Sequence, residues 1–98
     1  MESDAFHLMT DVDATGALVL TAGGYLDEAG GIELSREADA ALEAGHTRLH
    51  IDLEEVVLFN CAGVRQLLAA LEELKDCGGH VDLVRVRPPL QRLIDFTA

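Results

Sequence analysis

The strongest candidate for chemistry is a four-residue turn, Asn60-Cys61-Ala62-Gly63, between a predicted strand and a predicted helix. The thiol of Cys61 would face the positive end of the helix dipole, where a thiolate is stabilised. Oxidation of this sulfur to a sulfinic acid would leave a negative charge there. Asn60 is a preferred N-cap residue, because its side-chain oxygen can accept a hydrogen bond from a backbone N–H at the helix start. The turn could therefore carry a redox switch, or Cys61 could be a passive small residue at an interface.

The other residue types that do chemistry show no pattern typical of a reaction site. The histidines and cysteines lack metal-binding spacings such as Cys-x-x-Cys or His-Glu-x-x-His. The sequence has no glycine-rich phosphate-binding loop, and no carboxylates are gathered for acid–base work. We therefore expect no metal site, no cofactor and no enzymatic activity. Near the end of the chain, three arginines are expected at the rim of the fold, namely Arg85, Arg87 and Arg92.

The hydropathy pattern changes period on either side of the turn. Before it, apolar and polar residues alternate over residues 47–53, which predicts a strand, and a short apolar run follows at 56–59. After it, apolar residues recur along one face of a predicted helix that ends at Gly78-Gly79. This stripe consists of Val64, Leu67, Leu68, Leu71 and Leu74.

This strand, turn and helix resemble the STAS domain, in particular the small bacterial anti-sigma-factor antagonists. In that family the turn usually reads Asp-Ser-Ser/Thr-Gly, and its first Ser is phosphorylated by a partner kinase. Here Gly63 is kept, Asn60 replaces the acid, and Cys61 occupies the phospho-acceptor position. The stretch Gly24-Tyr25-Leu26-Asp27 resembles the family's Gly-Glu-Leu-Asp, with Tyr25 in place of the acid. Asp27 is expected to cap the next helix and to border the turn.

The rest of the chain completes one domain, residues 1–98. Strands are predicted at 6–12 and 17–22, the second broken by Gly23-Gly24. A helix is predicted over 28–44, but two glycines weaken its first turn, so its ordered part should begin near Ile32. A strand at 80–86 has apolar residues on both faces, which predicts a central position, and a short helix follows Pro89.

The order β-β-α-β-α-β-α predicts an α/β fold. The resemblance implies a single STAS-like domain whose mixed sheet has about four strands, with the helices mainly on one face.

Charge is distributed unevenly along the chain. Residues 1–55 hold thirteen acidic and two basic residues, whereas residues 56–98 hold five of each, and the total is −11. So acidic a domain should repel nucleic acid and anionic membranes, and it suits a basic protein partner or simply aids solubility. No apolar run approaches the roughly 20 residues of a membrane span, and the acidic start is unlike a signal peptide. We therefore expect a cytoplasmic protein.

The resemblance implies a binding module that sequesters an anti-sigma factor with a histidine-kinase-like ATP-binding fold and so frees a sigma factor. Because residues 48–96 contain no Ser or Thr, Ser/Thr phosphorylation should not control this turn. The alternatives are a STAS scaffold subunit of a larger signalling assembly, which could bind other STAS proteins, and a Cys61-based redox sensor. The expected partner-binding residues are Tyr25, Asp27, Asn60, Cys61, Ala62, Gly63, Val64, Arg65 and Leu68.

Overall fold

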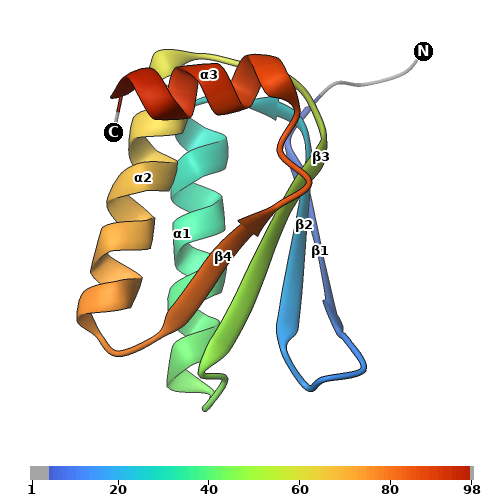
Figure 1. Ribbon diagram of the computed structural model, residues 1–98, viewed down its shortest axis with the longest axis vertical. Helices are drawn as coiled ribbons and strands as arrows, with labels where there is room; N and C mark the ends of the chain where they lie inside the picture. The colour runs from blue at the N-terminus through green and yellow to red at the C-terminus, as the bar shows by residue number, and fades with distance from the viewer. Residues whose placement is uncertain (1–4, 98) are drawn as a thin grey trace.

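The computed structural model describes residues 5–97. Within these residues, three helices and four strands follow one another in the predicted order, which confirms the α/β fold (Figure 1). The elements are β1 (His7–Val12), β2 (Leu18–Leu26), α1 (Glu28–Glu43), β3 (Arg48–Phe59), α2 (Cys61–Asp76), β4 (His80–Val84) and α3 (Pro88–Thr97).

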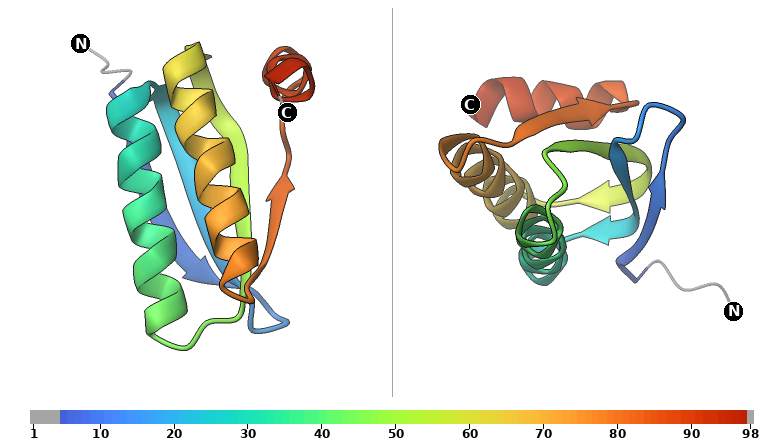
Figure 2. Two further views of the ribbon diagram at one scale, coloured as in Figure 1. Left: turned by 90° about the vertical axis from the view of Figure 1, so that its left-hand side faces the viewer. Right: turned by 90° about the horizontal axis from the view of Figure 1, so that it is seen from below.

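The four strands form one mixed sheet in the order β1-β2-β3-β4. The β1–β2 hairpin is antiparallel, whereas β2–β3 and β3–β4 are parallel pairs joined through α1 and α2. Figure 2 shows α1 and α2 side by side on one face of the sheet, and Figure 1 shows α3 crossing the end of the fold at which α2 begins. The prediction of a mixed sheet with helices mainly on one face is confirmed.

The core lies between the sheet and the two helices that cover it. Alternate residues of the strands point toward these helices, and Leu20, Ile51 and Leu53 are at most 1% exposed. The helices contribute their apolar stripes, so strands and helices bury complementary faces. The buried helical residues include Leu34, Val64, Leu67 and Leu74.

The sequence predicted a break of β2 at Gly23-Gly24, and this prediction was wrong. The strand continues through both glycines to Leu26. The glycines lie at irregularities in its pairing with β3, and Gly24 has a φ of +80°. A Cβ on Gly23 would lie 2.4 Å from Nε2 of His7. These glycines therefore allow bends and a close side-chain approach within a continuous strand.

The strand β3 is also longer than predicted, because it runs past Leu53 through two register shifts to Phe59. Thr21 pairs with Asp52 and Gly23 pairs with Glu55, so β3 carries one extra residue between these pairs. A β-bulge of this kind bends the strand and redirects its continuation. The bent second half of β3 leads directly into the Asn60 turn.

Helix α1 begins at Glu28, and the prediction of a start near Ile32 was wrong. The side chain of Asp27 caps the first turn by accepting a hydrogen bond from the N–H of Gly30. Close packing explains both glycines, since a Cβ on Gly30 would lie 2.8 Å from the ring of Phe6 and one on Gly31 would lie 2.5 Å from Cβ of Gln66. The cap and the close contacts outweigh the low helix propensity of glycine.

The strand β4 lies at the edge of the sheet beside β3, so the prediction of a central position was wrong. It also ends at Val84 rather than at residue 86, and Arg85 has a φ of +52°. Apolar residues on both faces of this segment had suggested a strand on each side of β4. Instead, Leu83 and Val86 pack against the core. Helix α3 contributes Leu90 and Ile94 to that core, which explains the hydropathy of this segment without a further strand.

Candidate functional site

Asn60 caps the start of α2, as predicted. Its Oδ1 accepts a hydrogen bond from the N–H of Gly63 at 2.8 Å, and its carbonyl oxygen accepts one from the N–H of Val64 at 3.1 Å. Its own N–H donates to the carbonyl oxygen of Leu26 at 3.2 Å. These bonds hold the turn against the end of β2 and satisfy N–H groups that a helix start otherwise leaves unpaired.

The two positions that depart from the acidic residues of the family pattern contact each other. Nδ2 of Asn60 donates a hydrogen bond to the hydroxyl oxygen of Tyr25 at 3.1 Å. An amide and a phenol therefore make a neutral pair where the family pattern has two carboxylic acids. The sequence showed each replacement separately, but the β2–β3 pairing that brings them together appears only in the structure.

Gly63 is required by its contact with the backbone of the preceding segment. A Cβ at this position would lie 2.2 Å from the carbonyl oxygen of Leu26 and 2.8 Å from that of Asp27. The start of α2 is therefore packed directly on the β2–α1 connection. Asp27 borders the turn through its backbone, while its side chain caps α1, as predicted.

The structure separates the other predicted contact residues by exposure. Cys61 and Arg65 are exposed, and Ala62 and Leu68 are half-buried. Val64 is fully buried in the core, so its side chain supports the site from below and takes no part in a contact surface. The exposed surface of this helix start therefore consists of a thiol, small or apolar groups and one arginine.

Two apolar residues beside the turn were not among the predicted site residues. Val57 and Leu58 of β3 are 53% and 52% exposed, and Leu58 pairs with Tyr25 across the sheet. The sequence contained a signal, the apolar run at 56–59, but a run does not show which side chains point outward. The second register shift of β3, between Gly24 and Tyr25, sets that orientation. Together, Tyr25, Val57 and Leu58 form an apolar rim beside Asn60.

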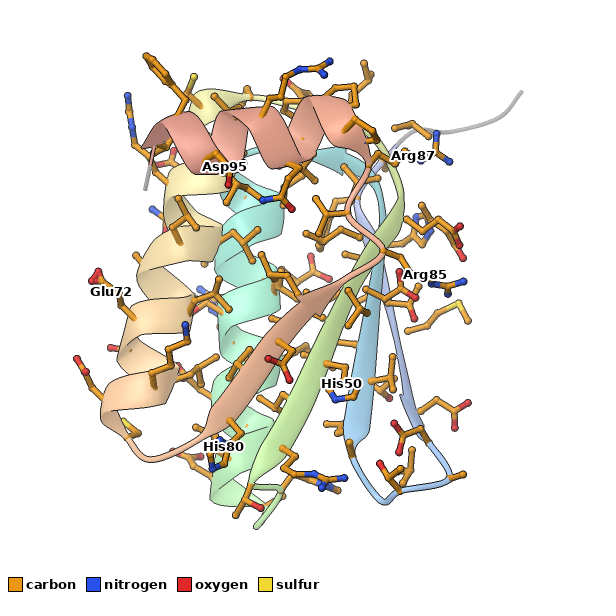
Figure 3. The ribbon with its side chains drawn as sticks, viewed as in Figure 1. His50, Glu72, His80, Arg85, Arg87 and Asp95 are labelled. Carbon is orange, nitrogen blue, oxygen red and sulfur yellow. The ribbon has the colours of Figure 1, made fainter. Side chains whose placement is uncertain are left out.

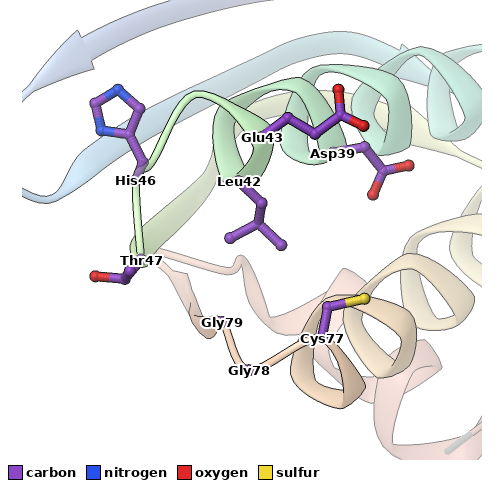
Figure 4. Close-up of a pocket in the computed structure, with 8 residues that line it drawn as sticks. All are labelled: Asp39, Leu42, Glu43, His46, Thr47, Cys77, Gly78 and Gly79. Carbon is purple, nitrogen blue, oxygen red and sulfur yellow. The ribbon is translucent and has the colours of Figure 1, made fainter.

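The second thiol, Cys77, lies at the opposite end of α2. Both cysteines are free and exposed. Cys77 lines a shallow cavity of about 350 Å³ near the ends of α1 and α2, into which Leu42 points while the His46 ring points away (Figure 4). Within the described part of the chain, no three or more His, Cys, Asp or Glu side chains are grouped so as to hold a metal ion. Among residues 5–97, no helix is long and apolar enough to cross a membrane.

Comparison with known proteins identifies the fold family. Residues 10–97 match the family described as "Mlab, STAS domain". An anti-sigma factor antagonist from Mycobacterium paratuberculosis is 26% identical, with 96% of this chain and 79% of that chain covered and a TM-score of 0.73. The Bacillus cell fate determinant SpoIIAA, in its phosphorylated form, is 20% identical, with 96% and 84% covered and a TM-score of 0.70.

A third solved structure, the protein TM1081, is 17% identical, with 99% and 82% of the two chains covered and a TM-score of 0.74. No curated protein matches the sequence. Because the family match spans nearly all of residues 5–97, and the fold and the turn agree with it, this chain belongs to the STAS domain family.

Proposed function

We propose that this STAS domain is a protein-binding regulatory module that captures an anti-sigma factor and so frees a sigma factor. The partner contacts the start of α2 and the rim beside it. Membership of the STAS family and the similarity to an anti-sigma factor antagonist support this role. The contact surface comprises Tyr25, Val57, Leu58, Asn60, Cys61, Ala62, Arg65 and Leu68.

The observation that carries this proposal is a capped turn without acidic or basic residues, with Cys61 exposed, on a protein of net charge −11. Its rim exposes about half of the side chains of Val57 and Leu58. Apolar and aromatic groups at the centre of an interface supply most of the binding free energy, whereas surrounding charges chiefly steer association. The acidic remainder of the domain would attract a partner with a basic surface.

The turn cannot be phosphorylated on Ser or Thr, because residues 48–96 contain neither. Phosphorylation would add about −1.5 to −2 charges at the start of α2. Cys61 keeps this position small and offers a kinase no hydroxyl group. The module therefore stays competent for binding whatever the activity of a Ser/Thr kinase toward this turn.

The decisive experiment substitutes the same residue at both ends of α2. Cys61→Asp places a negative charge inside the proposed interface, and Cys77→Asp places it outside. Wild type, Cys61→Ser and both Asp variants are immobilised and exposed to lysate of the protein's own organism, and captured proteins are identified by mass spectrometry. We expect wild type, Cys61→Ser and Cys77→Asp to recover an anti-sigma factor with a kinase-like ATP-binding fold.

Cys61→Asp should weaken capture, because a buried, unpaired interfacial charge costs about 2–5 kcal/mol, or at least about a thirtyfold change in affinity. Misfolding would not explain the loss. An acid at a helix N-terminus stabilises the helix by about 0.3–1 kcal/mol, whereas an acid at the C-terminus opposes the dipole. Cys61→Asp, which should bind weakly, should thus be more stable than Cys77→Asp, which should bind normally. Equal capture by both Asp variants would exclude the turn, and recovery of STAS proteins alone would favour a scaffold role.

A further inference from the structure

We propose that Arg85 is a positioning residue that couples the Asn60 turn to helix α3. The effect of Arg85 on partner binding rests on the proposed function, whereas the structural coupling does not. Arg85 follows the last residue of β4 in the connection to α3. Figure 3 shows Arg85 and Arg87 leaving this connection toward β3, on the side away from α1 and α2. Their contacts join the bulge of β3 to the start of α3.

Asp52 is the centre of these contacts, and it is a charged residue that is only 3% exposed. Nε of Arg85 donates to Oδ2 of Asp52 at 2.9 Å, and Nη2 of Arg85 donates to the same oxygen. Nη1 of Arg85 lies 2.9 Å from Oε1 of Glu54. The hydrogen bonds that Arg85 donates to Asp52 raise the pKa of the Arg85 guanidinium. A buried carboxylate that loses its ion-pair partner is left with an uncompensated desolvation cost.

The other oxygen of Asp52 stabilises the bent backbone of β3. Oδ1 of Asp52 accepts a hydrogen bond from the N–H of Glu54 at 3.0 Å. Glu54 lies in the bulge, between the residues of β3 that pair with Thr21 and with Gly23. The bulge takes this N–H out of the regular β2–β3 ladder, and the carboxylate satisfies it. Because the bent strand continues to Asn60, the orientation of the turn depends on Asp52.

The same bulge anchors the start of α3. Nε of Arg87 donates to the carbonyl oxygen of Glu54 at 2.7 Å, immediately before Pro88 opens the helix. Arg85 itself has a φ of +52°, a conformation that a residue with a side chain rarely adopts unless contacts with its surroundings hold it there. Its two carboxylate partners supply such contacts.

Helix α3 in turn borders the proposed binding surface. A shallow groove of about 510 Å³ is lined by Arg65 and Leu68 of α2 and by Thr97 at the end of α3. The next residue inward on α3, Phe96, is 88% exposed. Contacts made by Arg85 and Arg87 with the bulge therefore fix both the strand that leads into the turn and the helix that borders the same surface.

The test is amide hydrogen exchange by NMR on the isolated domain, with Arg85→Met and the matched variant Arg92→Met, which removes an exposed arginine of α3. We expect Arg85→Met to accelerate exchange at least about tenfold in α3 and at residues 61–64, relative to the β1–β2 hairpin, because an ion pair to a buried carboxylate is lost. Arg92→Met should change neither region.

A double-mutant cycle with Asp52→Asn identifies the partner through which Arg85 acts. The effects of Arg85→Met and Asp52→Asn on exchange should be strongly non-additive, because the two residues share one interaction. Should Arg85→Met fail to fold, Arg85→Lys keeps the charge but loses the forked geometry, and should give a smaller acceleration in the same two regions. Uniform acceleration across the domain, or acceleration in α3 without the turn, would overturn the coupling.

Measuring the affinity of each variant for the anti-sigma factor separates a failure of this inference from a failure of the proposed function. If wild type captures the anti-sigma factor, Arg85→Met should lower its affinity at least about tenfold while Arg92→Met leaves it unchanged. Unchanged binding by Arg85→Met would overturn the role in positioning the interface. If wild type captures no anti-sigma factor, the proposed function fails, whereas the exchange experiment still decides whether Arg85 couples the turn to α3.

Discussion

Replacing Gly63 by alanine tests how closely α2 is packed on the end of β2. The added Cβ would lie 2.2 Å from the carbonyl oxygen of Leu26, 2.7 Å from its carbonyl carbon and 2.8 Å from the carbonyl oxygen of Asp27. All three are backbone atoms, so no side-chain rotation can relieve the overlap. Either α2 moves away from the sheet or the β2–α1 connection shifts.

The expected destabilisation follows from two opposing effects. Overpacking of a well-packed site costs about 1–3 kcal/mol, and the upper part of this range applies because the neighbouring atoms cannot turn aside. Alanine gains up to about 1 kcal/mol over glycine in helix propensity. We therefore expect Gly63→Ala to lower the free energy of unfolding by about 2 kcal/mol, which for a domain of this size lowers Tm by about 8–16 °C.

A closely matched control exists in the other long helix. Gly30 holds the third position of α1, as Gly63 does in α2, and each N–H donates to the side chain of its N-cap residue. A Cβ on Gly30 would meet the side chain of Phe6 at 2.8 Å rather than backbone. Because the Phe6 side chain can move aside as a whole and backbone cannot, Gly30→Ala should cost less than Gly63→Ala, about 1 kcal/mol.

Urea unfolding of both variants, followed by circular dichroism, gives the free energies directly. A Gly63→Ala protein within about 0.5 kcal/mol of wild type would refute the close packing of α2 on the backbone. Equal losses in the two variants would refute the distinction between backbone and side-chain neighbours.

Two further predictions concern hydrogen bonds at turns. Asn60→Ala should lower the free energy of unfolding by about 0.5–2 kcal/mol through loss of the cap, whereas Asn60→Asp should fall within about 0.5 kcal/mol of wild type; urea unfolding checks both. At Asp13, the hydrogen bond from the Thr15 side chain chiefly lowers the carboxyl pKa, helped by the N–H groups of Thr15 and Ala17 and by His50, and opposed by desolvation. Because this pKa is lower in the folded protein than in the unfolded chain, the carboxylate stabilises the fold above about pH 4, and that contribution is lost as the pH falls through the lower folded value. Asp13→Asn should therefore be less stable than wild type at pH 7, and the difference should shrink toward pH 2; a constant difference across this range would contradict the linkage.

The sequence predicted the elements of the fold better than their limits. Alternation in residues 47–53 and the apolar stripe of α2 depend on which side chains are buried, and a periodic pattern records this directly. The errors at Gly23-Gly24 and at Gly30-Gly31 have a common cause. Local propensity treats glycine as a break, but here each pair provides bends or allows a close approach by a side chain distant in sequence. Such contacts cannot be read from the local sequence.

The candidate site shows the same division between local and long-range information. Asn60 and Asp27 were predicted as caps because capping involves residues only three positions apart. The hydrogen bond between Asn60 and Tyr25 joins residues 35 positions apart, and the ion pair between Asp52 and Arg85 joins residues 33 apart. Both depend on strand register, and the register of β3 depends on two bulges that the hydropathy pattern does not reveal.

Under the proposed function, the lack of charge at this turn serves binding rather than folding. Aspartate caps a helix as well as asparagine does, and a carboxylate at residue 60 would gain from the helix dipole. The hydroxyl of Tyr25 can donate a hydrogen bond as readily as accept one, so it could pair with that carboxylate. The fold would thus tolerate a charge at Asn60. The absence of this charge, together with the exposed apolar side chains of Val57 and Leu58, lowers the desolvation cost when a partner covers this surface. On the function proposed above, such a surface would favour a stable contact over one that a kinase can switch.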